Sequence, residues 1–442
     1  MTPAALYELR GCIQETFVSE APLLDAFSRD FGGLRCARPQ AVLPVRNEAE
    51  LIAALRILRR ERAPVTVRGS GLSCHGRTLT HGIVLENHAD VAEIEQIAED
   101  AVIVDGRCTW RSVVDKLKAR CLAPRVLTYS LSPTVGGTLS AGGFGAASIQ
   151  AGAQVDHVRR LRLILPCGDA VWCSPEENAL LFRWALGGFG RVGVIERAVI
   201  EVERWRPLVG TTCESFAGFA AAESAILRSE GDLFSAESKG DEVLCRTGRW
   251  AGVEELFKTD TAVPSESFQA TIPAVAAPGF SHIWCDYFVG PEGLGPMLRF
   301  LDKALPRAGL DRVQILAVKR PPLPGRRAFV PLPRFDSGRY FGIGVFYSVP
   351  SADAETVERA RAAQSALLEL CLRNGGRPYL CGAHDIDEDG IESIYGDEFR
   401  EVQRIRGPLD PDGLFNPPPA STFQREEAER LPENRRTADD RQ

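Results

Sequence analysis

Residues 132–145 read SPTVGGTLSAGGFG, and the fold prediction starts from this stretch. Its glycines are Gly136, Gly137, Gly142, Gly143 and Gly145. Glycine accepts positive φ and has no Cβ, so a backbone of this kind can lie against a flat or anionic ligand. Its free N–H groups can also form an anion-binding nest. The pattern predicts a ligand-binding bed or, alternatively, an irregular crossover loop that binds nothing.

A second glycine-rich run lies upstream, where residues 68–77 read RGSGLSCHGR. It follows directly on Val65-Thr66-Val67, which has the β-branched character of a short strand. Two separated runs of the same kind favour the ligand-binding interpretation over the crossover loop. We therefore predict that both runs line one ligand-binding site.

Composition narrows the class of protein. The chain has 442 residues, 44% of them hydrophobic and 25% charged, which is typical of a soluble globular protein of two or three domains. A net charge of −7 argues against a nucleic-acid-binding protein. We expect neither a membrane span nor a secretion signal. The twelve cysteines form no Cys-x-x-Cys pair, so reduced thiols and a cytoplasmic location are expected.

Alternating strand and helix patterns indicate an α+β nucleotide-binding domain over residues 1–205, with its core at 39–205. Residues 206–383 read as a second α+β domain that covers the ligand, with an antiparallel sheet flanked by helices. Residues 384–423 are predicted to return to the first domain, and 424–442 to form a disordered tail. Predicted helices span 216–227, 291–305 and 351–373, predicted strands span 282–289, 313–318 and 340–349, and a surface loop is predicted at 321–333.

Four ordered motifs resemble the vanillyl-alcohol-oxidase family of flavoproteins, whose fold is also called the p-cresol methylhydroxylase (PCMH) type. They are VRGSGLSCHGRT, TVGGTLS, GAQVDHV and the LGG-x-G-x-x-G-V-I run at 186–195, supported by DPDGLFNP near the C-terminus. The likeness is greatest to the cytokinin-dehydrogenase branch. It implies a PCMH-type FAD-binding domain of two subdomains plus a substrate (cap) domain.

The resemblance also implies which residues hold FAD. The first run would wrap the pyrophosphate, the second would line the pyrophosphate and flavin side, Val194 would meet the adenine through its backbone, and Asn416 would sit by the isoalloxazine. The cofactor-binding residues implied in this way are Gly69, Ser70, Gly71, Leu72, Ser73, Arg77, Thr134, Gly136, Gly137, Ser140, Gly143, Phe144, Val194 and Asn416.

Two positions depart from the family pattern. Many relatives carry a histidine that bonds covalently to the flavin where this chain has Leu72, and some carry a cysteine where this chain has Ser132. We therefore expect noncovalent FAD. The neighbouring Cys74 and His75 are the alternative covalent anchors.

The catalytic candidates come from both halves of the chain. Tyr129 stands where cytokinin dehydrogenases have the aspartate that takes the substrate proton, which argues against cytokinin oxidation. Tyr129 is read as an acid–base or hydrogen-bonding group over the flavin, or as a packed aromatic beside it. The family layout implies that Tyr379 or His384, the latter expected on a returning strand, lies near the flavin, with a surface or core role as the alternative for each. Glu237 falls where the cytokinin branch has a substrate glutamate.

No metal site is expected. Asp385-x-Asp387-x-Asp389-Gly390 imitates the start of a calcium loop, but Gly396 stands at the twelfth position, which requires a bidentate glutamate. These acids are therefore expected in an exposed loop.

The predicted function is an FAD-dependent oxidase of a small organic substrate, acting by hydride transfer from a C–H next to O or N to flavin N5. Secondary metabolism is one setting. Molecular oxygen would be the acceptor, and a homodimer is compatible with the sequence. The alternatives are a dehydrogenase with another acceptor and a flavin-binding protein without redox turnover.

Overall fold

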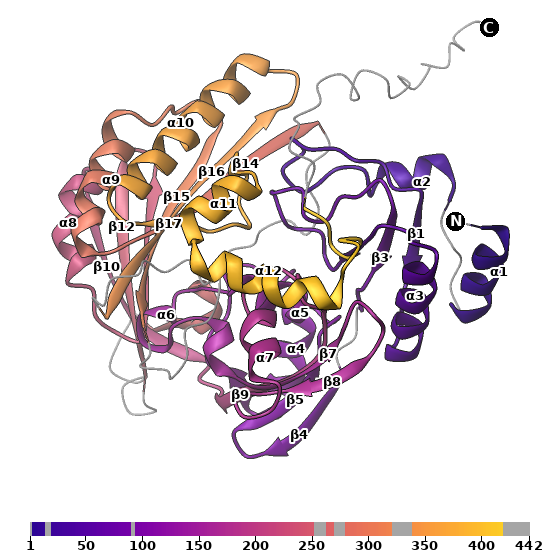
Figure 1. The fold of residues 1–442 in the computed structure, drawn as a ribbon. Helices are drawn as coiled ribbons and strands as arrows, with labels where there is room; N and C mark the ends of the chain where they lie inside the picture. The colour runs from indigo at the N-terminus through magenta and orange to yellow at the C-terminus, as the bar shows by residue number, and fades with distance from the viewer. Residues whose placement is uncertain are drawn as a thin grey trace, which may run out of the picture.

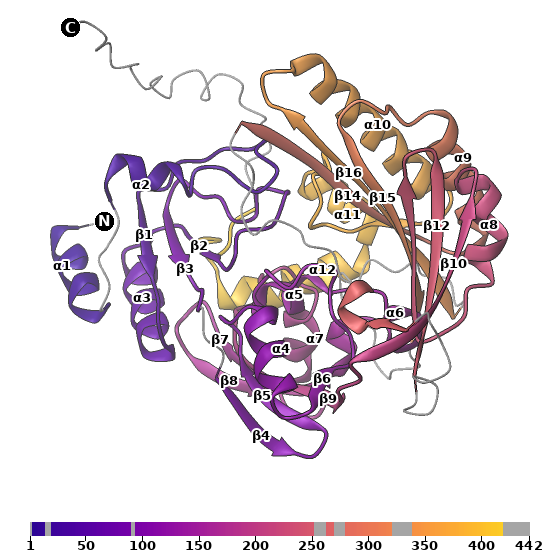
Figure 2. The same ribbon diagram turned by 180° about the vertical axis from the view of Figure 1, so that it is seen from behind.

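The computed structural model describes residues 2–13, 19–89, 93–251, 262–268, 279–320 and 338–418. The predicted surface loop at 321–333 and the predicted tail at 424–442 lie outside these residues. Three sheets organise the described part of the chain, and helices pack against each of them. In Figures 1 and 2 the smallest and the largest sheet stand on opposite sides, with the third sheet below both.

The first sheet is small and parallel, and helices α1 and α3 pack beside it. Its strands, in spatial order, are β1 (Ala41–Pro44), β3 (Ile83–Glu86) and β2 (Val65–Arg68). Helix α3 (Glu48–Arg60) begins at Asn47, whose side chain accepts the Glu50 N–H. Its apolar face is buried against β1 and β3, and α1 (Pro3–Cys12) covers α3 from outside. Helix α2 spans Ala21–Asp25.

The second sheet is antiparallel and completes the first domain. Its spatial order is β4 (Ile94–Ala98), β5 (Ala101–Asp105), β9 (Val194–Arg204), β7 (Val158–Ile164) and β8 (Ala170–Cys173), with β6 (Leu122–Pro124) paired to β9. Strands β7 and β8 form an antiparallel hairpin that turns at Cys167-Gly168-Asp169. Helices α4 (Trp110–Lys118), α5 (Val135–Ala141) and α7 (Ala179–Ala185) lie above it (Figure 2). Helix α6 (Ser148–Ala151) instead packs against the third sheet, where Ile149 joins the core.

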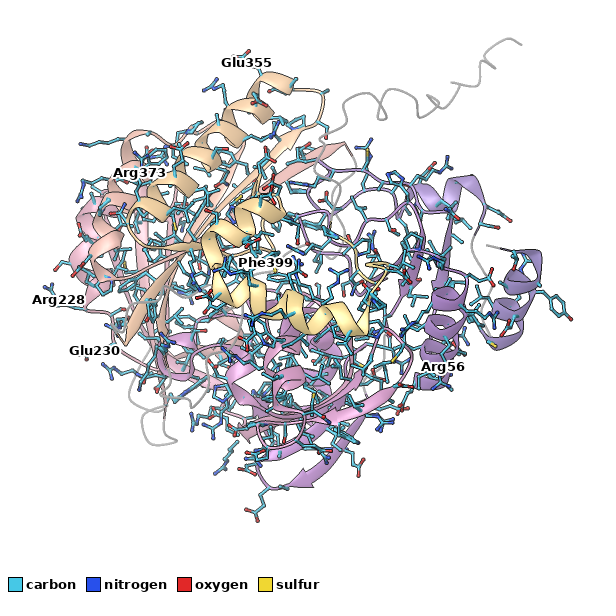
Figure 3. The ribbon with its side chains drawn as sticks, viewed as in Figure 1. Arg56, Arg228, Glu230, Glu355, Arg373 and Phe399 are labelled. Atoms are coloured by element: carbon cyan, nitrogen blue, oxygen red, sulfur yellow. The ribbon has the colours of Figure 1, made fainter. Side chains whose placement is uncertain are left out.

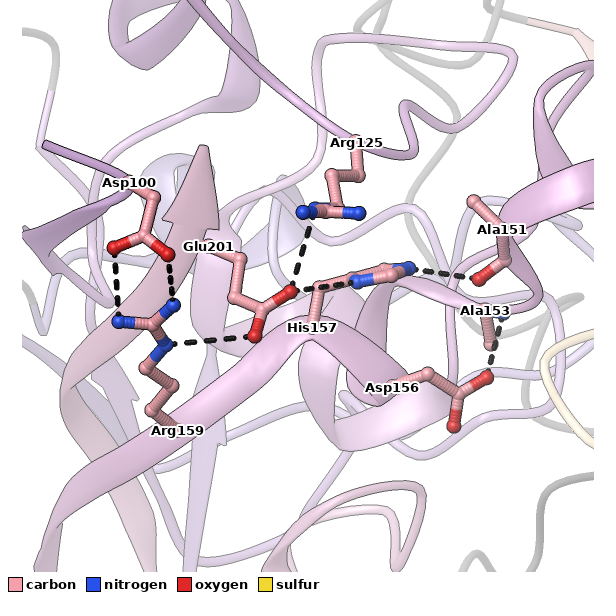
Figure 4. Close-up of polar contacts among 8 residues, drawn as sticks. All are labelled: Asp100, Arg125, Ala151, Ala153, Asp156, His157, Arg159 and Glu201. Carbon is pink, nitrogen blue, oxygen red and sulfur yellow. Dashed lines mark hydrogen bonds and ion pairs between the residues drawn. The ribbon is translucent and has the colours of Figure 1, made fainter. Parts of the chain in front are cut away.

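A polar network fastens one end of this sheet (Figure 4). Glu201 on β9 accepts hydrogen bonds or ion pairs from Arg125, His157 and Arg159, and Arg159 also pairs with Asp100 in the β4–β5 turn. The other ring nitrogen of His157 lies 2.7 Å from the Ala151 carbonyl oxygen. Both nitrogens of His157 are therefore used in holding secondary structure together.

The third sheet, called the cap sheet below, forms the second domain. Its order is β13 (Ala262–Pro264), β10 (Leu208–Phe216), β12 (Glu242–Trp250), β11 (Leu233–Lys239), β15 (Leu310–Lys319), β16 (Arg339–Pro350), β14 (Phe280–Val289) and β17 (Arg377–Pro378). Helices α8 (Phe219–Leu227), α9 (Pro291–Lys303) and α10 (Ala354–Arg373) cover its outer face (Figure 1). Glu355 and Arg373 on α10 point away from the sheet in Figure 3.

The C-terminal segment runs back across both domains. Helices α11 (Glu388–Tyr395) and α12 (Asp397–Leu409) lie in front of the sheets (Figure 1). Phe399 of α12, labelled in Figure 3, is buried in the core that these helices share with the second sheet. Phe415 then forms a parallel bridge with Val65 of β2. The predicted α+β fold class is confirmed by this arrangement.

Several local predictions need correction. Phe216, predicted as the start of a helix, ends β10, because this stretch pairs with β12. His384 is not on a strand, because pairing with β14 ends at Pro378. The acids predicted in an exposed loop instead include the start of α11, where the Asp387 side chain caps the helix by accepting the Gly390 N–H.

Candidate functional site

A deep cleft opens where β2, β9 and α5 meet, and both glycine runs line it. It encloses about 1290 Å³ of empty space, open solvent at its mouth included. Its lining contains Gly69, Ser70, Gly71, Leu72, Ser73, Arg77, Asn87, Thr128, Thr134, Gly136, Gly137, Ser140, Phe189, Gly190, Val194, Tyr379, Cys381 and Asn416, among others. Twelve of the fourteen cofactor-binding candidates are in this list, all except Gly143 and Phe144.

The two glycine runs touch each other at the cleft. A Cβ built on Gly69 would lie 2.4 Å from Thr134 Oγ1, and Ser70 Oγ donates to the Ser132 carbonyl at 2.8 Å. Gly71 has a φ of +70°, which a residue with a Cβ rarely adopts. The prediction that the runs come together is confirmed, and it is the absence of side chains that permits the approach.

The second run is more regular than the sequence suggested. Residues Val135–Ala141 form helix α5, and Thr134 caps it by accepting the Gly137 N–H at 3.2 Å. A glycine is needed in this helix because Gly136 packs closely on the turn after β5. A Cβ at Gly136 would lie 3.0 Å from the Gly106 carbonyl oxygen. The alternative of an irregular crossover loop is therefore wrong for Val135–Ala141.

Arg77 places a buried positive charge in the cleft wall. Its Nε and Nη2 have no hydrogen-bond partner among the described residues, and its guanidinium lies 4.9 Å from the centre of the Phe189 ring. Burial, with the nearby Arg191, lowers the pKa of Arg77 to about 9. Buried cations are costly unless a counter-charge accompanies them, so the cleft wall is suited to an anionic ligand.

Asn416 ties the C-terminal segment to the cleft. Its side-chain amide donates to the Gly190 carbonyl at 2.9 Å, and its oxygen accepts the Val67 N–H at 2.8 Å. Gly190 has no room for a Cβ, which would lie 3.0 Å from the Asn416 amide nitrogen. Asn416 thus fixes the spacing between β2 and the turn before β9, where Val194 also lines the cleft.

These features fit FAD. A dinucleotide needs backbone N–H donors at close range, a counter-charge for its phosphates and a long apolar slot. The cleft supplies the glycine runs, the unpaired nitrogens of Arg77 and a lining that is largely apolar.

Four candidates lie away from the cleft wall. Gly143 donates its N–H to the Tyr379 hydroxyl at 3.2 Å, and Phe144 packs 4.6 Å from Phe288, so both stand behind Tyr379. Cys74 and His75, the alternative covalent anchors, are buried and are not among the residues that line the cleft. His75 instead borders a separate cavity beside α11.

Tyr129 and Glu237 meet although they are far apart in sequence. The Tyr129 hydroxyl donates to the Glu237 carboxylate, and the guanidinium of Arg312 on β15 lies 5.0 Å from the Tyr129 ring centre. Burial, the charge of Glu237 and this hydrogen bond raise the pKa of the Tyr129 phenol. Tyr129 is therefore a neutral hydrogen-bond donor next to Thr128, which lines the cleft.

Tyr379 and His384 differ in their access to the cleft. Tyr379 lines it, and burial strongly raises the pKa of its phenol. His384 is buried and does not line the cleft, and its Nε2 lies 3.2 Å from the carbonyl oxygen of Asp286 on β14. Burial lowers the pKa of His384 to about 4, so the ring is neutral at physiological pH.

Sequence reasoning missed Arg312 and Cys381. Arg312 could have been found from strand alternation, since it precedes Val313 and Ile315, which face the cap helices. Cys381, which lines the cleft, carried no local signal. Within the described ranges, no group of three or more His, Cys, Asp or Glu could hold a metal ion, and no helix is long and apolar enough to cross a membrane.

Comparison with known proteins is consistent with this geometry. A sequence profile described as an FAD binding domain matches residues 39–174. An uncharacterized oxidoreductase of the fasciation locus of Rhodococcoides fascians is 35% identical over 179 residues, 40% of this chain and 41% of that protein. Cytokinin dehydrogenase 9 of Oryza sativa subsp. japonica is 30% identical over 261 residues, 56% of this chain and 49% of that enzyme.

The crystal structure of 6-hydroxy-D-nicotine oxidase from Arthrobacter nicotinovorans has a similar fold, with a TM-score of 0.69 at 16% identity, over 94% of this chain and 98% of that one. The chain spans less than half the length of the two curated relatives named above. From the profile, the relatives, the shared fold and the fit of the cleft, we conclude that residues 39–174 contain an FAD-binding domain and that this chain binds FAD.

Proposed function

We propose that this protein is an FAD-dependent oxidoreductase that oxidises a small organic substrate at a C–H bond next to oxygen or nitrogen. Bound FAD would supply the two-electron acceptor for that bond. The observation that carries the proposal is the continuity of the site. Tyr379 and Thr128 line the FAD cleft, and Tyr129, Glu237 and Arg312 stand next to them.

In this proposal the first domain holds the cofactor and the cap sheet holds the substrate. The first glycine run and Arg77 bind the phosphates, and the residues of α5 line the flavin side. Tyr129 donates a hydrogen bond, Glu237 accepts one, and Tyr379 closes the cleft with its hydroxyl held by the Gly143 N–H. The cap sheet over this site excludes water from it.

The proposal includes noncovalent FAD. Leu72 stands in the cleft at the position of the histidine anchor, and Cys74 and His75 are not among the residues that line the cleft. Acid precipitation of the purified protein should leave the yellow colour in the supernatant. Yellow colour in the pellet would contradict this part of the proposal.

The proposal also includes oxygen as the acceptor and a cytoplasmic location. All twelve cysteines are free thiols, which fits a reducing compartment.

The function is tested by anaerobic mixing with a panel of alcohols, amines and aldehydes while the flavin absorbance is followed. At least one class should bleach the flavin. Comparing recovery in air with recovery under an added quinone then separates an oxidase from a dehydrogenase. A protein that keeps FAD but is bleached by none of the panel would be a flavin-binding protein without turnover.

A further inference from the structure

A second cavity lies beside α11, and the proposed function makes no use of it. It encloses about 1500 Å³ of empty space, open solvent at its mouth included, and is called the α11 pocket below. The first glycine run borders both cavities. Ser73 and Arg77 line the FAD cleft, whereas His75 between them lines the α11 pocket. The two cavities are therefore neighbours that are lined by different side chains of one run.

His75 brings a buried polar ring without a partner to the α11 pocket. The residue is 1% exposed, and neither ring nitrogen has a hydrogen-bond partner among the described residues. Burial, together with the charges of Arg77 and Arg35, holds the pKa of His75 well below its usual range, so the ring is neutral and carries one N–H. An unmatched buried donor is costly. An acceptor is therefore expected beside His75, and the two nearby cations favour one with negative charge.

An ion pair between a buried cation and an exposed carboxylate also lines the α11 pocket. Arg35 Nη2 lies 3.6 Å from Asp385 Oδ1, and the side chains are 7% and 51% exposed. Arg35 thus belongs to the floor of the pocket and Asp385 to its mouth. A ligand that meets both residues needs a negative group for the guanidinium and a positive group for the carboxylate. Because the pair is 3.6 Å apart, the two ligand groups must be close neighbours.

Further carboxylates stand at the mouth. Asp387 and Asp389 line the pocket, and both residues are exposed. Their charges favour a cation there. The acids do not form a metal site, because no group of three or more His, Cys, Asp or Glu within the described part of the chain could hold a metal ion. An organic ammonium group is the cation that this open rim suits.

The rest of the wall is mainly aliphatic. Ile386 and Ile391 are buried, Leu368 and Ile394 are half-buried, and Leu372 of α10 is 37% exposed. An exposed leucine beside buried isoleucines leaves apolar surface that a ligand would remove from water. The pocket therefore combines a cationic floor, an acidic mouth and an aliphatic wall.

We propose that the α11 pocket binds an α-amino acid with an aliphatic side chain. Its carboxylate accepts hydrogen bonds from Arg35 and the His75 N–H, and its ammonium group meets Asp385 at the mouth. Its side chain lies on Ile391 and Leu372. A simple carboxylate would face the acids of the mouth without a cation, and a simple amine would face Arg35 without an anion. The α-amino acid alone among these carries both charges on neighbouring atoms.

The test measures binding to the holoenzyme by isothermal titration calorimetry with three probes of one carbon skeleton. L-Leucine carries both charges, 3-methylbutylamine lacks the carboxylate, and 4-methylpentanoate lacks the ammonium group. Leucine should bind at one site per chain, and each truncated probe should bind about 10-fold more weakly or worse. Equal affinity for leucine and either truncated probe would overturn the inference. So would a leucine signal that follows a change in flavin absorbance, because the ligand would then occupy the FAD cleft.

Two variants remove opposite ends of the site. His75→Leu deletes the N–H and leaves no unmatched polar group, and Asp385→Asn deletes the charge at the mouth. Each should weaken leucine binding about 10-fold. His75→Leu should leave the affinity for 3-methylbutylamine unchanged, and Asp385→Asn should do the same for 4-methylpentanoate. Asp311→Asn, at an exposed carboxylate on β15, should bind all three probes as the wild type does.

The two variants do not depend on each other. Asp385 is half-exposed, so its replacement by asparagine should fold even where a change at the buried His75 does not. Wild-type affinity for leucine in Asp385→Asn would by itself overturn the inference. An affinity loss in Asp385→Asn that leucine and 3-methylbutylamine share, and that 4-methylpentanoate lacks, supports it.

Discussion

The FAD cleft and the inner face of the cap sheet use different parts of the chain to make a site. The cleft is made mainly of backbone, because glycines let two loops approach until Gly69 meets Thr134. The cap face is made of side chains on separate strands, Glu237 on β11 and Arg312 on β15. The contrast suggests that the cofactor site tolerates little change in shape, whereas the substrate site can change chemistry one residue at a time.

The largest effect is expected from Gly69→Ala, which adds a Cβ at 2.4 Å from Thr134 Oγ1. The two runs must separate, and FAD affinity should fall by about 100-fold, equivalent to about 2.7 kcal/mol. Equilibrium titration of apoprotein with FAD measures this. Gly407→Ala on α12, where a Cβ meets no atom within 4 Å, is the matched control. Unchanged affinity in Gly69→Ala would mean that the cleft does not depend on backbone shape.

Arg77→Gln tests whether the cleft also depends on charge. FAD affinity should fall about 30-fold, since a charge-assisted contact of about 2 kcal/mol is lost. The melting temperature of the apoprotein should rise, because an unpaired buried cation has been removed. A structural arginine would instead lower stability when replaced. Arg56→Gln, at an exposed pair with Asp169 (Figure 3), should change neither quantity.

The third prediction concerns how the buried, neutral His384 makes the stability of the protein depend on pH. Its pKa is about 4 in the folded protein against 6.5 in the unfolded chain, so the unfolded state binds more protons between these values. Stability should therefore fall as the pH drops from 7 to 5, by about 2 kcal/mol from this group. His384→Gln should show a smaller fall in denaturant titrations at the two pH values. His81→Gln, at an exposed histidine, should behave as wild type.

The smallest effect is expected for the pair of Tyr129 and Glu237. A double-mutant cycle with Tyr129→Phe and Glu237→Gln should give a coupling of about 1 kcal/mol in unfolding free energy. Glu237→Gln should also lower the pKa of Tyr129, seen as tyrosinate absorbance at lower pH, because the carboxylate charge is gone. A coupling of zero would mean that the two side chains do not act together.

How much could be predicted differs between these two regions. The residues that line the cleft were predictable because glycine runs carry their backbone requirement in the local sequence, as at Gly69 and Gly71. The substrate side was predictable only in part. Tyr129 and Glu237 were named separately, and nothing in the sequence indicated that the Tyr129 hydroxyl would contact the Glu237 carboxylate. Outside both regions, His75 was named only as an alternative anchor, and nothing in the sequence indicated that its buried ring would lack a hydrogen-bond partner among the described residues.

The sequence by itself determined which two runs line the cleft, because backbone donors and the absence of Cβ atoms are local properties of a short run. It also determined the alternation that makes β14 and β15 strands. Only the tertiary structure decided that Gly136 lies in a capped helix and that His384 is sealed beneath the cleft. It also decided that Arg312, Tyr129 and Glu237 gather in one place. The physical reason is that pairing between strands distant in sequence sets which side chains share a face, and burial there sets their charge.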